Sequence, residues 1–219
     1  MATVVRSFAI QGIDGYPVDI EIKMLEGQPS ISIIGLGDQA VKEAAERIQA
    51  AIDESGYVFP KKRVIISLAP GDKKKSGSHF DLAMAVGVLC QNGDIGVKKL
   101  PDYGFIGELS LDGRLRACRG ILPMIIAGQK RGIKKIIVPE ANFKEASLVH
   151  GVEILGFYDL IGVVRYLEGK TSGIEMHMEE NEKILEESER ILDFKDVKGQ
   201  DKLIEAVVLA AAGGHNMLM

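Results

Sequence analysis

The sequence has little cysteine and no long hydrophobic run. Its two cysteines, Cys90 and Cys118, lie in apolar or mixed stretches without C-x-x-C spacing, which argues against a disulfide framework or a zinc site. No apolar run approaches the roughly 18 residues that a membrane-spanning helix needs, and the first residues contain no apolar signal segment. These absences predict a soluble, cytoplasmic protein with no membrane partner.

An excess of either charge is also missing. The 219 residues include 27 basic and 31 acidic side chains, a formal net charge of −4. Any contact with a polyanion must therefore be local. Lys73, Lys74 and Lys75 form the most basic cluster, beside hydroxyl and amide donors at 76–78, and are candidates for contacting a nucleic-acid backbone. The alternative is a solvated loop, because no aromatic residue for base stacking is interleaved with the lysines.

A phosphate-binding loop is absent as well, because the motif G-x-x-x-x-G-K-[ST] occurs nowhere in the sequence. Residues 213–219 nevertheless resemble the approach to such a loop, with a Gly-Gly turn after an Ala-rich helix and then a short apolar run. We therefore expect the sequence to be a piece of a longer nucleotide-binding protein. Nucleotide chemistry is not expected from this piece alone.

Hydrophobic periodicity predicts an α+β, or mixed α/β, domain that ends near residue 169. The first three predicted strands are expected to form an antiparallel meander, and an Asp-Gly turn at 112–113 is expected to close a later hairpin. Strands are predicted at 3–10, 16–25, 30–34, 63–68, 105–109, 135–138 and 152–155, and helices at 38–56, 80–90, 121–130, 143–149 and 160–167.

The character of the sequence changes after residue 169. Residues 170–193 are rich in glutamate and poor in core-forming residues, which predicts a charged linker in which 182–191 could form a solvated helix. Residues 194–219, with a predicted helix at 202–212, open a second module that is cut off. Without its partner strands, this module is expected to be poorly ordered or to pack opportunistically.

Residues 32–40 fit G-x-G-x-x-A, a variant of the dinucleotide-binding fingerprint, with Asp53 and Glu54 downstream. A structural role is favoured, with Gly35 and Gly37 as turn residues and Asp38 as a helix cap. A carboxylate at a helix N-terminus would repel a pyrophosphate, and the expected meander differs from a parallel βαβ unit.

The four histidines indicate no metal site. His79, His150, His177 and His215 have no second ligand at metal-binding spacing. We expect His79 to be structural, hydrogen-bonded near the start of a helix.

Three ordered segments, 35–43, 68–82 and 107–114, carry a family resemblance. The chain resembles the magnesium-chelatase-like AAA+ ATPases of the ComM/YifB group over essentially its whole length. The resemblance implies that residues 1–169 have the fold of the C-terminal, proteolytic domain of Lon protease, which is similar to ribosomal protein domain 2. An ATPase module would follow from residue 194.

Lon-type proteolysis needs a serine nucleophile and a lysine base. Matching the motifs places His79 at the nucleophile position and Leu122 at the lysine position, and leucine cannot accept a proton. We therefore expect no catalytic residue. Ser76 and Ser78 could substitute as nucleophiles, so a residual Lon-type serine hydrolase remains an alternative, as does a magnesium-chelatase-type subunit.

The resemblance also implies cofactors and partners. ATP and magnesium would bind the full-length protein and not this piece, and Val197, Gly199 and Gln200 would lie against the adenine only when the missing phosphate-binding loop is present. The protein would form a homo-oligomer, hexameric at full length, and DNA is a possible partner. No porphyrin is expected. The implied role is a non-catalytic N-terminal domain of an ATP-dependent ring motor that acts on DNA during uptake or recombination.

Overall fold

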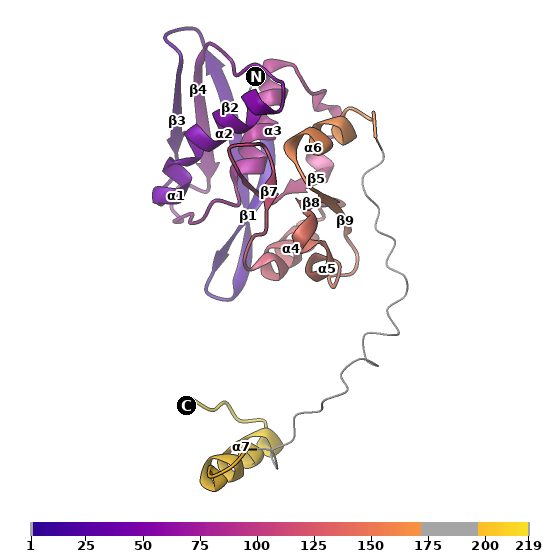
Figure 1. The fold of residues 1–219 in the computed structure, drawn as a ribbon. Helices are drawn as coiled ribbons and strands as arrows, with labels where there is room; N and C mark the ends of the chain where they lie inside the picture. The colour runs from indigo at the N-terminus through magenta and orange to yellow at the C-terminus, as the bar shows by residue number, and fades with distance from the viewer. Residues whose placement is uncertain (1, 172–196, 219) are drawn as a thin grey trace. The chain divides into compact units, whose positions relative to one another are not determined.

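The computed structural model describes residues 2–171 and 197–218. The chain divides into two compact units, residues 1–176 and 177–219 (Figure 1). Most of the predicted linker, with the possible helix at 182–191, lies outside the described residues, as does residue 194, where the second module was predicted to begin. Among the residues that are described, no helix is both long and apolar enough to cross a membrane.

The first unit is built on a seven-stranded mixed sheet with the order β3-β4-β2-β1-β5-β8-β9. The pairs β1–β2 and β2–β4 are antiparallel, and the other neighbouring pairs are parallel, so the mixed α/β prediction is confirmed. A separate hairpin joins β6 to β7. The strands are β1 Thr3–Gln11, β2 Asp14–Leu25, β3 Ser30–Ile34, β4 Arg63–Ala69, β5 Tyr103–Phe105, β6 Glu108–Leu109, β7 Leu115–Arg116, β8 Lys135–Pro139 and β9 Glu153–Phe157.

The helices of this unit lie near their predicted positions. The predicted helix at 38–56 is divided by Glu43 into two segments, and the helix predicted at 143–149 is shorter than expected. The helices are α1 Gln39–Lys42, α2 Ala44–Glu54, α3 Asp81–Asn92, α4 Ile121–Lys130, α5 Phe143–Ala146 and α6 Leu160–Leu167, with 3-10 turns at Val97–Asp102 and Glu140–Asn142.

Two hydrophobic clusters fill the interior. The larger contains α3, whose residues from Asp81 to Cys90 are all buried, together with the apolar stripe of α2. The smaller contains α4 and Phe8. Because neighbouring strand residues point to opposite faces, the placement of Phe8 in one cluster and Ala9 in the other indicates that the clusters lie on opposite sides of β1.

The predicted antiparallel meander was wrong beyond the β1–β2 hairpin. Strand β4 lies between β2 and β3, and β3 runs parallel to β4 in a register that pairs Ser32 with Ile65. The crossover through α1 and α2 buries Ala44, Ile48 and Ile52 of α2 in the larger cluster. Residues 32–40 therefore do open a parallel β-α-β unit, and one of the two arguments against a dinucleotide site falls.

Candidate functional site

The loop at 71–78, called the lysine loop below, is hydrogen-bonded to the start of α1. The Lys75 N–H donates to the Leu36 carbonyl at 3.1 Å, and the Lys75 carbonyl accepts from the Asp38 N–H at 2.9 Å. The Asp38 carboxylate accepts from the Val41 N–H at 3.0 Å and from the Gly77 N–H at 3.1 Å. Asp38 is therefore both the predicted helix cap and the anchor of the lysine loop.

These contacts oppose the dinucleotide alternative. Asp38 already occupies the amides at the start of the helix, where a pyrophosphate would bind. Gly35 has a φ of +117°, and a Cβ on it would lie 2.3 Å from the Leu68 carbonyl oxygen. The positive φ and the close approach of the β4 main chain both require glycine at position 35. A bound ligand is not needed to explain this residue.

The three predicted nucleic-acid lysines have different environments. Lys74 is exposed, and Lys73 lies over the Tyr16 ring, with its ammonium 4.5 Å from the ring centroid. Lys75 is fully buried, its ammonium donates to the Pro70 carbonyl, and burial lowers its pKa. The prediction that Lys75 contacts nucleic acid was therefore wrong, because its side chain cannot reach a phosphate from this position.

Two residues that are remote in sequence complete the surface beside the lysine loop. A cavity of about 350 Å³ brings Lys73 together with Tyr16 and Arg131, and Asp19 also lines it. The Tyr16 hydroxyl donates to the Lys74 carbonyl at 3.1 Å. Because Lys73 lies over one face of the ring, Tyr16 helps to position the lysine. The cavity lining supplies two basic side chains for a local anionic contact.

Ser78 lies at a second cavity, the Ser78 pocket, of about 390 Å³. Its hydroxyl donates to the Glu108 carboxylate, which also lies 3.5 Å from the Arg116 guanidinium. No lysine lines the pocket, and Leu122 is not among its lining residues. The lining residues are Ile10, Ser76, Gly77, Ser78, His79, Glu108, Ala117, Cys118 and Arg119. Ser78 thus bonds to a carboxylate, and the pocket lining offers no amine that could act as a Lon-type base.

His79 is structural, as predicted. Its Nε2 lies 2.9 Å from the Phe8 carbonyl oxygen, and burial lowers its pKa. In the tautomer that carries its proton on Nε2, His79 donates a hydrogen bond to this carbonyl and so links the start of α3 to β1. Across the residues described, no group of three metal-ligating side chains comes together.

The sequence interpretation missed an ion pair between a half-buried arginine and a buried aspartate. The Arg47 guanidinium on α2 binds both oxygens of Asp81, with Nε 2.8 Å from Oδ2 and Nη2 3.1 Å from Oδ1. The Leu109 N–H also donates to Asp81, and Arg47 donates to the Ala40 carbonyl. Burial raises the pKa of Asp81 to about 6, although Arg47 opposes the shift. The feature of the sequence that could have indicated this pair is Asp81, an acidic residue at the start of the apolar run 80–90.

Asn142 is a second polar residue that the sequence interpretation missed. It is buried, its side-chain oxygen accepts from the Cys118 N–H at 2.7 Å, and its side-chain nitrogen donates to the Cys118 carbonyl at 2.9 Å. This pair of bonds holds one wall of the Ser78 pocket. The thiol of Cys118 has a pKa raised to about 12 by burial and is therefore not a nucleophile at neutral pH.

The second unit contains the residues predicted to lie against adenine. Val197, Gly199 and Gln200 are exposed and directly precede helix α7, Asp201–Gly213, which matches the predicted helix. The Gln200 carbonyl accepts from the Ile204 N–H at 2.9 Å, so it begins the helix. None of the helix residues is buried.

Comparison with known proteins places this mixed α/β chain among magnesium-chelatase-type proteins. The family described as subunit ChlI of Mg-chelatase matches residues 20–142. The match covers more than half of the chain, and the chain belongs to this family.

Similar individual proteins agree with the family. The competence protein ComM of Haemophilus influenzae is 33% identical over 98% of this chain, and YifB of Escherichia coli K12 is 35% identical over 99% of it. The chain spans 42% of the length of each of these relatives. The Lon protease of Rhizobium meliloti is 27% identical over 65% of the chain and 18% of its own length.

Proposed function

We propose that residues 1–169 form a non-catalytic, Lon-like domain that precedes the ATPase module of an AAA+ ring motor, and that the motor acts on DNA. Residues 170–193 link this domain to a module that starts at residue 194. Membership in the ChlI family supports the ATPase assignment, and the partial match to Lon protease supports the Lon-like fold. The DNA assignment draws on the similarity to a competence protein.

One observation carries the non-catalytic assignment. The serine that could replace the Lon nucleophile, Ser78, bonds to Glu108, and no amine lines its pocket. The neighbouring imidazole of His79 is bound to a main-chain carbonyl. A Lon-type hydrolase would need an unprotonated amine within hydrogen-bonding distance of the hydroxyl, so this alternative has no base to work with.

ATP and magnesium would bind the ATPase module, with Val197, Gly199 and Gln200 against the adenine. These residues are exposed and directly precede α7, which is compatible with such a contact. The module would assemble into a homo-oligomeric ring, hexameric in the complete protein. The first unit would guide DNA toward that ring through Lys73, Lys74 and Arg131.

The DNA contact can be tested by charge reversal. The double variant Lys73→Glu/Lys74→Glu should bind a fluorescent single-stranded oligonucleotide about 10- to 100-fold more weakly than the wild-type chain, because two phosphate contacts become repulsive. The slope of log affinity against log salt should fall by about 1.4, or about 0.7 for each lost contact. Fluorescence anisotropy at several salt concentrations measures both quantities.

Lys75→Met is the matched control for this experiment. It removes a positive charge from the same loop, but that charge is buried against the Pro70 carbonyl. Its DNA affinity should stay within about 2-fold of the wild-type value, a difference well below 1 kcal/mol. An equal loss of affinity in the control and in the double variant would contradict direct phosphate contacts by Lys73 and Lys74. It would mean that only the conformation of the loop matters for DNA binding.

A further inference from the structure

Strand β3 is an edge strand with an open side. It pairs with β4 and, within the described residues, with no other strand. Its sequence, Ser-Ile-Ser-Ile-Ile, contains none of the charges or prolines with which proteins commonly block pairing at a sheet edge. An unprotected edge of this kind presents a row of main-chain donors and acceptors to a further strand.

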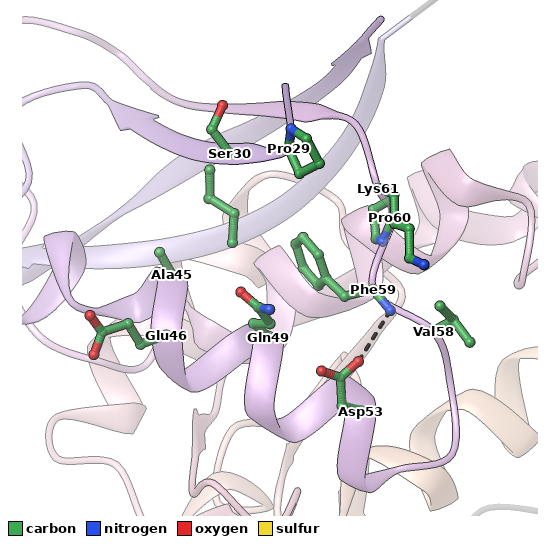
Figure 2. A pocket seen from close by; sticks show the side chains of 11 residues that line it. Pro29, Ser30, Ala45, Glu46, Gln49, Asp53, Val58, Phe59, Pro60 and Lys61 are labelled. Atoms are coloured by element: carbon green, nitrogen blue, oxygen red, sulfur yellow. Dashed lines mark hydrogen bonds between the residues drawn. The ribbon is translucent and has the colours of Figure 1, made fainter. Parts of the chain in front are cut away.

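A groove lies beside the start of this strand (Figure 2). Its volume is about 590 Å³, and it runs between the start of β3, the outer face of α2 and the segment 58–61. Figure 2 shows Phe59 between Ser30 on β3 and Gln49 on α2. Val58, at the groove margin, is 71% exposed. The groove therefore offers apolar surface next to open main-chain groups.

The α2 side of the groove is acidic. Glu46 and Asp53 line it, two helical turns apart, or about 10.5 Å along the axis. Glu46 is exposed and has no ion-pair partner among the residues described, and Asp53 uses its Oδ1 to accept from the Phe59 N–H at 3.2 Å. Lys61 is the one basic lining residue. The lining therefore has two acidic side chains and one basic side chain, and its net negative charge favours a basic ligand.

We propose that the β3 edge and this groove bind an extended peptide in which apolar and basic side chains alternate. The peptide adds to the sheet as a strand beside β3, and its main chain bonds to the open edge. Residues two or four apart on an extended chain are about 7 or 14 Å apart, so two flexible basic side chains on one face can reach Glu46 and Asp53. The apolar side chains of such a peptide point to the opposite face of the sheet.

Charge argues against two other occupants of the groove. In a two-fold pairing of β3 with β3 of a second copy, the acidic face of α2 would meet the same acidic face of its partner. The segment 170–193 of this chain is rich in glutamate and would also meet like charge. A separate basic peptide avoids both repulsions.

The test uses three fluorescein-labelled hexapeptides and the chain of residues 1–219. One alternates lysine and valine, one alternates glutamate and valine, and one is the lysine peptide with alternate residues N-methylated so that one edge cannot donate hydrogen bonds. The lysine peptide should bind at least 10-fold more tightly than the other two in fluorescence anisotropy. Similar binding of all three peptides, or no binding of the lysine peptide, would overturn the proposal.

Matched variants of α2 locate the site. Glu46→Lys should weaken binding of the lysine peptide about 5- to 30-fold, because an attractive contact becomes repulsive. Glu54→Lys makes the same charge change on the same helix outside the groove lining and should alter binding less than about 2-fold. Equal losses in the two variants would contradict the assignment to the groove. Self-association of the chain that displaces the peptide would show instead that a second copy covers the edge.

Discussion

Replacing Arg47 with methionine is expected to lower the free energy of unfolding by about 3 to 5 kcal/mol. Methionine keeps much of the apolar stem, so the loss comes from the charge. Asp81 has a side chain that is 1% exposed, and Arg47 supplies two of the hydrogen bonds that it accepts. Without Arg47, a carboxylate stays buried, and the donor that remains to it among the described residues is the Leu109 N–H. Urea unfolding followed by circular dichroism measures the change.

The same variant should have a characteristic pH dependence. The pKa of Asp81 is raised to about 6 in the folded chain, so between its unfolded pKa and about 6 the folded state binds more protons than the unfolded state. The contribution of Asp81 to stability therefore falls as pH rises through this range. Removing Arg47 raises the pKa of Asp81 in the folded chain further. The decrease in stability then occurs at higher pH. Stability measured from pH 5 to 8 should decline more steeply than in the wild-type chain.

The control for this prediction is the double variant Arg47→Met/Asp81→Asn. It has no buried carboxylate to leave unpaired, so it should recover at least half of the lost stability and lose the added pH dependence. Equal destabilisation of the single and double variants, with no change in the pH profile, would mean that the ion pair does not hold α2 against α3.

Replacing Phe8 with alanine is expected to lower the free energy of unfolding by about 3 to 5 kcal/mol, because a large cavity remains in the α4 cluster. Phe8 is fully buried, and its ring fits against two glycines. A Cβ on Gly104 would lie 2.6 Å from the ring, and one on Gly128 would lie 2.8 Å from it. Neither glycine has a side chain that could move into the space that alanine leaves. Urea unfolding measures the loss.

A double-mutant cycle checks this explanation. Gly104→Ala alone should destabilise the chain, because its methyl group clashes with the Phe8 ring. In the Phe8→Ala background the same methyl group enters the cavity and should cost less or become favourable. Equal costs in both backgrounds would show that the ring does not occupy the space between the two glycines.

Much of the fold was predictable because its elements have strong local signals. The apolar stripe and the terminal glycine located the helix at 121–130, and Asp38 was identified as a cap from its place before an amphipathic run. The pairing of β3 was not predictable in this way. Local periodicity says that residues 30–34 form a strand, but it does not say that a strand starting at Arg63 will lie beside it.

The candidate site was less predictable than the fold, because it depends on contacts between distant segments. Lysines in one run look alike in the sequence, yet burial separates Lys75 from Lys73 and Lys74. Arg131 and Lys73 are 58 positions apart and meet only in the folded chain. The partner of Asp81 was missed for the same reason, since Arg47 lies on a different helix.

We propose above that the first unit delivers DNA to an ATPase module that begins at residue 194. The most direct test of this proposal is ATP hydrolysis by a chain extended to the length of the relatives, measured against increasing single-stranded DNA. DNA should stimulate hydrolysis, and Lys73→Glu/Lys74→Glu should raise the DNA concentration at half-maximal stimulation about 10-fold or more while the rate without DNA stays unchanged. An extended chain that hydrolyses ATP at the same rate with and without DNA would contradict the claim.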